Sequence, residues 1–281
     1  MQKKFAVIGF PLTHTMSPFI HKRLFELNGL NCRYDVIEIP PEKLCENANF
    51  LKTLDGYNIT IPHKEAIIPL IDKLDASATT YNAVNTVKSE NNISVGYNTD
   101  ATGFKNALAL EDIPFCGKML ICGAGGVART VAIEAAKNNL DITVAVRNTS
   151  SCRALNLKNE LKIRFNTEIS LITLDDVKSE FDIAVNGTPL GMYPNINSSP
   201  LKTEQLKNIK YLFDTVYNPT ETLLVKNAKS VGVKAINGMG MLVLQAAKAQ
   251  NIWYGAEFNS NDLKQLIEDA KNETERIFKN V

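Results

Sequence analysis

A glycine-rich segment in the middle of the chain has the spacing of a phosphate-binding turn. It lies between a strand predicted over Lys118–Cys122 and a helix predicted over Val127–Asn138, and a second strand is predicted over Ile142–Val146. This βαβ order is the context that a dinucleotide fingerprint requires, because a helix N-terminus offers N–H groups and a positive dipole end to a pyrophosphate. The residues expected to contact the dinucleotide are Gly123, Ala124, Gly125, Gly126 and Val127.

The end of the second predicted strand indicates which dinucleotide is bound. Chains that bind NAD usually carry Asp or Glu there for the ribose 2′-hydroxyl, whereas an arginine can pair with the 2′-phosphate of NADP. Here Val146 is followed by Arg147 and Asn148, and no acid is present. An exposed surface arginine is the simpler alternative, but its position favours NADP as the cofactor.

Polar residues gather at the ends of predicted strands in the N-terminal third, where α/β proteins place ligands. Thr15 and Ser17 are two hydroxyls in the loop after the first strand, and Ser17 could equally cap the following helix. In the next cluster, side chains alternate along the predicted strand, so Asn58 and Thr60 lie on one side of it. Lys64 follows just beyond the end of that strand. Such hydroxyl, amide and ammonium groups suit a carboxylate or a hydroxylated ring.

Two further clusters contain Asn85 and Asp100. Taken alone, a lysine such as Lys64 is usually a solvated charge, and an aspartate in Asn-Thr-Asp is often only a helix cap. The functional interpretation therefore depends on whether these separate segments come together.

Strand-like and helix-like segments alternate from end to end, which predicts an α/β architecture with mainly parallel sheets. The predicted strands are Phe5–Ile8, Tyr34–Ile39, Tyr57–Ile61, Ala83–Val87, Ile93–Tyr97, Lys118–Cys122, Ile142–Val146, Phe181–Asn186, Tyr211–Asp214 and Val233–Ile236. The fourth and fifth are expected to form a hairpin. The predicted helices are Pro18–Leu27 with Ser17 as N-cap, Glu42–Leu54, Val127–Asn138, Met241–Ala249 and Asn261–Phe278.

These segments together resemble the signatures of the shikimate dehydrogenase family, in the family's order from residue 5 to about residue 256. The matching segments are Thr15-x-Ser17-Pro18, Asn58-x-Thr60-x-Pro62-x-Lys64, Ala83-Val84-Asn85-Thr86, Asn98-Thr99-Asp100 followed by Gly103, Gly123–Arg129, Asn186–Met192, Tyr217–Thr222 and Asn237–Ala246. The resemblance implies an NADP-dependent enzyme that reversibly reduces 3-dehydroshikimate to shikimate in aromatic amino-acid biosynthesis.

The resemblance also implies roles for individual residues. By motif position Lys64 resembles the family's acid/base lysine and Asp100 its partner. A hydride delivered to a ketone carbon leaves an alkoxide, which a lysine held beside a carboxylate can protonate and stabilise. The residues that resemble substrate contacts are Thr15, Ser17, Thr60, Asn85, Asp100, Tyr217 and Gln245. Those that fall where the family contacts NADP are Gly123, Ala124, Gly125, Gly126, Val127, Arg147, Asn148 and Gly238.

Two domains are expected for a chain of 281 residues. Residues 1–101 plus 238–281 are predicted to form the α/β substrate-binding domain, with a mainly parallel sheet, and residues 102–237 a Rossmann-type NADP-binding domain. If Gln245 reaches the substrate, the C-terminal helices return to the first domain and the site lies in the cleft between domains.

Departures from the family pattern keep alternatives open. Thr15 stands where the family usually has a serine, so the sequence does not determine whether quinate is also a substrate. Val146-Arg147-Asn148 replaces the usual Asn-Arg-Thr, so the strictness of the preference for NADP over NAD is not determined either. The nearest alternative is a quinate/shikimate dehydrogenase with broader substrate and cofactor use. A folate dehydrogenase is disfavoured because the polar set does not suit a pterin. A non-catalytic NADP-binding sensor is disfavoured because it would not need both Lys64 and Asp100.

Composition excludes several other classes. Lys and Arg total 31 against 30 Asp and Glu, so we expect no nucleic-acid or anionic-membrane partner. Five cysteines without a C-x-x-C pair, and three scattered histidines, predict neither a metal site nor a disulfide framework, and favour a reducing cytoplasm. The sequence contains no run of about 18 apolar residues, so no membrane span is predicted. The expected partner is a small-molecule substrate, and a monomer and a homodimer both stay open.

Overall fold

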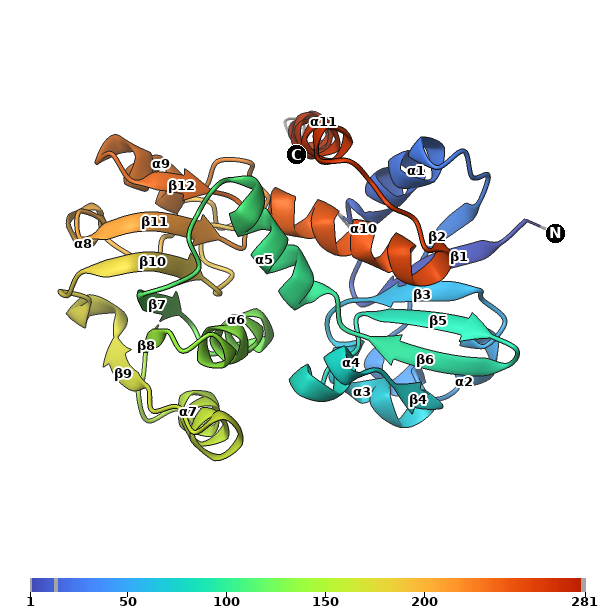
Figure 1. Ribbon diagram of the computed structural model, residues 1–281, viewed down its shortest axis with the longest axis horizontal. Helices are drawn as coiled ribbons and strands as arrows, with labels where there is room; N and C mark the ends of the chain where they lie inside the picture. The colour runs from blue at the N-terminus through green and yellow to red at the C-terminus, as the bar shows by residue number, and fades with distance from the viewer. Residues whose placement is uncertain (1, 13–14, 279–281) are drawn as a thin grey trace. The chain divides into compact units, whose positions relative to one another are not determined.

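The computed structural model describes residues 2–12 and 15–278. Within these residues, the strands form two six-stranded sheets (Figure 1). The sheets belong to different units of the chain. The first unit comprises the residues up to Gly103 together with Val243–Ala270, and the second comprises Phe104–Leu242 and the residues from Lys271 onward. The predicted α/β class with mainly parallel sheets is confirmed.

The sheet of the first unit has the order β2-β1-β3-β5-β6-β4. Its strands are β1 (Lys4–Gly9), β2 (Arg33–Glu38), β3 (Gly56–Ile59), β4 (Lys73–Leu74), β5 (Thr86–Glu90) and β6 (Ile93–Tyr97). Strand β5 is antiparallel to both of its neighbours, and the other pairs are parallel. The carboxyl ends of β1, β3 and β6 and the start of β5 therefore share one edge.

Helices cover both faces of this sheet because side chains alternate along each strand. On one face, Phe5 packs with Phe25 of α1 (Ser17–Leu27) and Trp253 of α10 (Met239–Tyr254). The opposite face, with Ala6 and Ile8, packs against the short helices α2 (Ala48–Leu51), α3 (His63–Ala66) and α4 (Ala76–Tyr81).

The predicted hairpin of β5 and β6 is confirmed, although β5 begins at Thr86 rather than Ala83. Its two turn residues, Asn91 and Asn92, have φ angles of 52° and 61°. Both lie in the left-handed region, which asparagine tolerates and which two-residue hairpin turns require.

The sheet of the second unit has the order β12-β11-β10-β7-β8-β9, with all pairs parallel. Its strands are β7 (Lys118–Cys122), β8 (Asp141–Val146), β9 (Ser170–Thr173), β10 (Phe181–Asn186), β11 (Ile209–Asp214) and β12 (Lys234–Ile236). The strand order reverses between β7 and β10, and doubly wound sheets bind ligands at the carboxyl ends beside such a reversal.

Helices connect the parallel strands of this unit. They are α6 (Gly126–Lys137), α7 (Cys152–Phe165), α8 (Thr203–Leu206) and α9 (Leu223–Ser230), whereas α5 (Asp100–Leu110) begins in the first unit and precedes β7. The helix α11 (Ser260–Phe278) and the 3-10 helices η1 (Pro41–Lys43), η2 (Ile68–Leu70) and η3 (Leu174–Asp176) complete the elements of the described chain. Among the described residues, no helix has the length and apolar character needed to cross a membrane.

Several predicted boundaries are wrong. The single helix expected over Glu42–Leu54 is interrupted by a turn between η1 and α2, where the Lys43 carbonyl accepts from both the backbone N–H and the side chain of Asn47. Ser17 is the first residue of α1 and not its cap, which is Met16. Strand β3 ends at Ile59 rather than Ile61, and β9 was not predicted at all.

The end of the chain also divides differently from the expected boundaries at residues 101 and 238. The described residues from Lys271 onward belong to the second unit. Within that unit the Thr220 hydroxyl donates to Glu275 at 2.9 Å, and the ring of Tyr193 lies 5.7 Å from that of Phe278.

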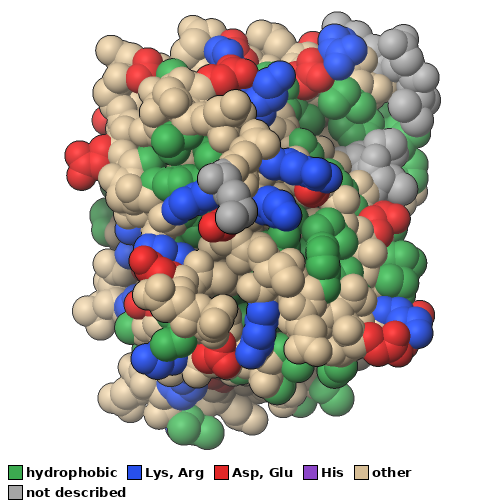
Figure 2. Space-filling view, turned by 90° about the vertical axis from the view of Figure 1, so that its right-hand side faces the viewer, with side chains coloured by type: hydrophobic (Ala, Val, Ile, Leu, Met, Phe, Trp, Pro, Cys, Tyr) green, Lys and Arg blue, Asp and Glu red, His purple; other side chains and the backbone are tan. Residues whose placement is uncertain are grey.

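Lys and Arg side chains are interspersed with Asp and Glu over the face shown in Figure 2, in keeping with the net charge of +1.

Candidate functional site

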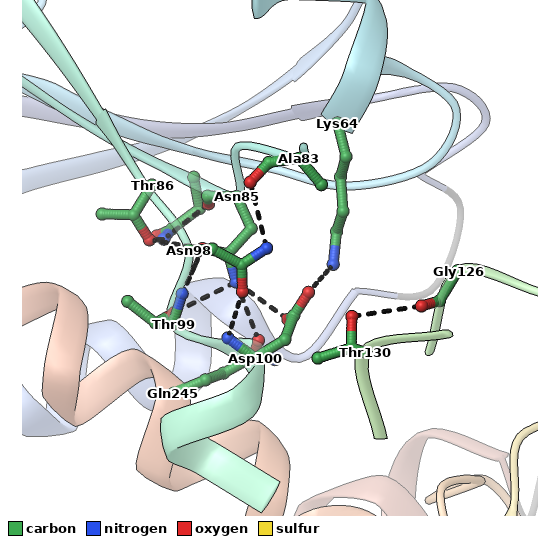
Figure 3. Close-up of polar contacts among 11 residues, drawn as sticks. Lys64, Ala83, Asn85, Thr86, Asn98, Thr99, Asp100, Gly126, Thr130 and Gln245 are labelled. Carbon is green, nitrogen blue, oxygen red and sulfur yellow. Dashed lines mark hydrogen bonds and ion pairs between the residues drawn. The ribbon is translucent and has the colours of Figure 1, made fainter. Parts of the chain in front are cut away.

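One edge of the first sheet collects three of the polar residues singled out in the sequence. Lys64 follows β3 within α3, Asn85 immediately precedes β5, and Asp100 begins α5 shortly after β6. Because β5 runs antiparallel between β3 and β6, residues that are widely separated in the sequence meet at this edge. Figure 3 shows their side chains pointing toward one another.

Lys64 and Asp100 form an ion pair at the centre of this group. The Lys64 Nζ lies 2.6 Å from the Asp100 Oδ2, with side-chain exposures of 26% and 8%. The lysine backbone is held in place because its carbonyl accepts from Val84 N–H at 2.7 Å, and the buried ring of the preceding His63 bonds the Ile39 carbonyl at 2.6 Å. The ammonium group is thus fixed by a buried carboxylate and still reachable from solvent.

The Asn85 amide joins the ion pair to the C-terminal part of the chain. Its Nδ2 donates to Asp100 Oδ1 at 2.8 Å and to Gln245 Oε1 at 3.2 Å. Its Oδ1 accepts from the Thr99 backbone N–H at 2.9 Å, which leaves one possible orientation for the amide. Four of the predicted site residues, Lys64, Asn85, Asp100 and Gln245, are therefore brought together by direct hydrogen bonds.

The remaining predicted substrate contacts of the first unit lie at the same edge but outside this network. Thr15 Oγ1 accepts from Ser17 N–H at 3.2 Å, and Thr60 N–H donates to the Ile8 carbonyl at 2.9 Å. All three are half-buried, and among the described residues none has a side-chain hydrogen bond to Lys64 or Asp100. The Ser17 side chain is hydrogen-bonded to Tyr34, and Thr15 Oγ1 accepts from Ser17 N–H, so both hydroxyls are already positioned at this edge.

The glycine turn of the second unit fits a dinucleotide. Gly123 follows β7 with φ at 102°, where only glycine is unstrained, and a Cβ there would lie 2.8 Å from Thr188. A Cβ on Gly187, after β10, would lie 2.8 Å from the buried Ala128 Cβ, so the small residues permit the close approach of α6. Ala124, Gly125, Gly126 and Val127 form the turn into the N-terminus of α6.

Arg147 and Asn148 follow β8 and are exposed. Within the described part of the chain, no carboxylate pairs with the Arg147 guanidinium, whereas Asn148 Oδ1 accepts from Ser150 N–H at 2.9 Å. An exposed guanidinium without an acidic partner, in the place where NAD-binding chains carry an acid, fits a 2′-phosphate.

Tyr217 and Gly238 belong to the second unit, whereas Lys64 and its partners belong to the first. Gly238 N–H donates to the Val216 carbonyl at 3.0 Å, beside Tyr217. A Cβ at Gly238 would lie 2.2 Å from the Thr215 carbonyl oxygen, so the close approach of these two segments requires glycine.

Asp214, a buried carboxyl at the end of β11, was not identified from the sequence. It accepts from Thr222 Oγ1 at 2.6 Å and from Asn186 Nδ2 at 2.9 Å. Burial raises the pKa of Asp214 to about 6, against the opposing effect of these hydrogen bonds. Its position at a strand end was the only available signal, because no motif spacing distinguishes it.

The raised pKa of Asp214 predicts a pH-dependent stability. Between about pH 4 and pH 6 the folded chain keeps a proton that the unfolded chain releases, so this group lowers the free energy of unfolding as the pH rises. Asp214→Asn mimics the protonated form. We therefore expect the free energy of unfolding of the variant, relative to that of the unmodified protein, to rise by up to about 3 kcal/mol from pH 4 to pH 7. Urea unfolding at both pH values measures this change.

The control for this experiment is Asp141→Asn, which removes an exposed carboxyl from the same unit. Its stability difference from the unmodified protein should be the same at both pH values. A pH-independent difference for Asp214→Asn as well would show that the Asp214 carboxyl is already ionised in the folded chain at pH 4.

Comparisons with known proteins identify relatives along nearly the whole chain. A family model described as the shikimate dehydrogenase substrate binding domain matches residues 7–87. The shikimate dehydrogenase (NADP(+)) of Methanocaldococcus jannaschii is 41% identical over 273 residues, which cover 95% of this chain and 96% of that protein.

Solved structures agree with this relationship. A shikimate dehydrogenase crystallised in complex with NADP+ has a TM-score of 0.87 and 38% identity, covering 95% of both chains. The Thermus thermophilus shikimate 5-dehydrogenase in complex with NADP(H) and shikimate has a TM-score of 0.86 and 32% identity, covering 96% of this chain and 100% of that one.

Proposed function

The chain belongs to the shikimate dehydrogenase family, and we propose from this premise that it catalyses the reversible NADPH-dependent reduction of 3-dehydroshikimate to shikimate. The observation that carries the proposal is the Lys64–Asp100 ion pair, held by Asn85 at one edge of the first sheet. The product serves the shikimate pathway of aromatic amino-acid biosynthesis.

Lys64 acts in this proposal as the acid and base of the reaction. NADPH, when bound, supplies the hydride that reduces the ketone carbon. The Lys64 ammonium lies beside the carbonyl oxygen, gives it a proton as its charge develops, and accepts that proton in the reverse direction. Asp100 Oδ2 holds the ammonium at 2.6 Å, so that the proton donor does not have to be oriented during the reaction.

Binding of the substrate is assigned to the polar groups around this pair. Asn85 and Gln245 present amides to the substrate hydroxyls, Thr60 adds a hydroxyl, and Thr15 and Ser17 hold the carboxylate. Tyr217 is assigned to the substrate by its motif position. Neutral donors suit this task because a hydroxylated ring offers many hydrogen-bonding groups and only one charge.

The second unit is assigned to the cofactor. Gly123, Ala124, Gly125, Gly126 and Val127 would hold the pyrophosphate at the N-terminus of α6, Gly238 would contact the cofactor, and Arg147 with Asn148 would bind the adenosine 2′-phosphate. We likewise assign residues 1–101 and 238–281 to substrate binding and residues 102–237 to NADP, except that Gly238 and residues 271–278, which belong to the second unit, are assigned with the cofactor. A reducing cytoplasm suits the five cysteines, which are free thiols.

The proposed function is tested by initial rates of shikimate and quinate oxidation, each with NADP and with NAD, followed through the absorbance of the reduced nicotinamide. We expect turnover with shikimate and NADP to be the fastest of the four. Comparable rates with quinate or NAD would instead identify a broad-specificity quinate/shikimate dehydrogenase, in which the methyl group of Thr15 and the segment around Arg147 relax selection. Absence of turnover with all four pairs would contradict an enzymatic role.

A further inference from the structure

A continuous chain of hydrogen bonds crosses the first sheet and ends at the carboxylate that holds Lys64. The Tyr34 hydroxyl donates to Asn58 Oδ1 at 2.7 Å, and Asn58 Nδ2 donates to Thr86 Oγ1 at 3.1 Å. Thr86 Oγ1 then donates to Asn85 Oδ1 at 3.1 Å, and Asn85 Nδ2 donates to Asp100 Oδ1 at 2.8 Å. Figure 3 shows the inner part of this chain, from Thr86 to Lys64.

The strand register explains why these side chains meet. Asn58 of β3 and Thr86 of β5 are directly opposed in the antiparallel pair, so both point to the same face of the sheet. Tyr34 of β2 is in register with Phe5, which marks the face covered by α1 and α10. The hydrogen-bond chain therefore runs along one face, across four neighbouring strands.

Each donor in the chain determines the direction of the next. The Thr86 hydroxyl accepts from the Asn58 amide, so its single proton is directed at Asn85 Oδ1. With Oδ1 accepting from Thr86 as well as from the Thr99 backbone N–H, the NH₂ group of Asn85 must face Asp100. Thr86 is fully buried, so water does not replace its hydrogen bonds.

The outer end of the chain is anchored by packing rather than by charge. The Tyr34 ring stacks on His21 with centroids 4.4 Å apart and an interplanar angle of 11°. His21 is bonded in turn to Gln250 of α10 at 3.2 Å. Burial lowers the pKa of His21 to about 3, so the ring is neutral at working pH and places no charge beside the chain.

We propose that Thr86, supported by Asn58 and Tyr34, is a positioning residue for the reduction, because it holds the Asn85 amide in the orientation that orders Asp100 and, through it, Lys64. This inference rests on the proposed function. Loss of the Thr86 hydroxyl removes one of the donors to Asn85 Oδ1, so the amide, which keeps the Thr99 backbone N–H, is held less firmly and its hold on Asp100 weakens. We therefore expect a lower turnover. The affinity for the cofactor, which is assigned to the second unit, should not change.

The test uses Thr86→Val, which keeps the shape and the β-branch of the side chain and removes only the hydroxyl. We expect kcat for shikimate oxidation to fall about tenfold, the loss that one misdirected buried hydrogen bond produces, with the KM for NADP within about twofold of the unmodified enzyme. Thr86→Ser restores the hydroxyl and should restore most of kcat.

Ser89→Ala is the matched control on the same strand. Its hydroxyl is buried and has no hydrogen-bond partner within the described part of the chain, so its removal should leave kcat unchanged. Tyr34→Phe removes the outermost donor of the hydrogen-bond chain and should lower kcat by a smaller factor, about twofold to threefold. It also keeps the proposal testable if Thr86→Val folds poorly, which thermal unfolding would reveal.

The outcomes separate this proposal from the proposed function. An unmodified protein that turns over shikimate, with Thr86→Val and Tyr34→Phe both as active as Ser89→Ala, would overturn the positioning role alone. An unmodified protein without turnover would contradict the function itself. A fall in kcat that Thr86→Ser does not restore would mark Thr86 as a packing residue and would also overturn the proposal.

Discussion

Replacing Lys64 with methionine is expected to lower kcat for shikimate oxidation by about 10³-fold to 10⁴-fold, the upper range for removal of a general acid and base. Methionine keeps the length of the side chain and removes the ammonium group, which lies 2.6 Å from Asp100. The affinity for NADP should stay within about threefold, because the residues assigned to the cofactor are elsewhere in the chain. Steady-state kinetics with shikimate and a fluorescence titration with NADPH measure the two effects.

Two further variants show whether Lys64 transfers a proton or only supplies charge. Lys64→Arg keeps the positive charge but does not release a proton. We therefore expect its kcat to exceed that of Lys64→Met by less than about tenfold. Lys73→Met, which removes an exposed lysine of the same unit, should leave turnover unchanged. Normal kcat in Lys64→Met, in a protein with unaltered thermal unfolding, would refute the assignment.

Replacing Arg147 with glutamine should lower the preference for NADP over NAD by about 10-fold to 100-fold. The guanidinium is exposed and has no acidic partner among the described residues, so its pairing with a 2′-phosphate is worth the 1.5–3 kcal/mol or so of a charge-assisted hydrogen bond. NAD lacks that phosphate, so kcat/KM with NAD should change little. The ratio of kcat/KM for the two cofactors, with shikimate saturating, measures the effect.

Salt provides an independent check on the Arg147 assignment. An exposed charge pair is screened as ionic strength rises, so the KM of the unmodified enzyme for NADP should increase with salt more steeply than that of Arg147→Gln. Lys178→Gln removes a side chain that is 81% exposed in the same unit and should leave the cofactor ratio unchanged. An unaltered ratio in Arg147→Gln would show that other groups select the cofactor.

Local patterns predicted most of the fold. Strands β7 and β10 were predicted with their observed bounds, and the Asn91-Asn92 hairpin was placed correctly, because apolar runs and turn residues act over a few neighbouring positions. The same reasoning failed over Glu42–Leu54, where the predicted single helix is divided by a turn into η1 and α2.

The site was predictable only in part. Lys64, Asn85, Asp100 and Gln245 were identified from their motifs, and the structure joins them by direct hydrogen bonds. Thr86 lay within a recognised motif but was not selected, because its importance depends on a partner across the sheet. The roles assigned to the individual site residues stay predictions until the variants are measured.

By itself, the sequence determined the βαβ phosphate turn, the absence of an acid after β8, and the set of polar residues available for chemistry. These features depend on residue type and short spacing, which folding does not alter. Only the tertiary structure decided how that set is oriented: Asn85 meets Gln245 across 160 positions of the chain, and Thr86 meets Asn58 across 28. The direction of a buried amide is set by the donors and acceptors that surround it, and here those come from strands and helices that only folding brings together.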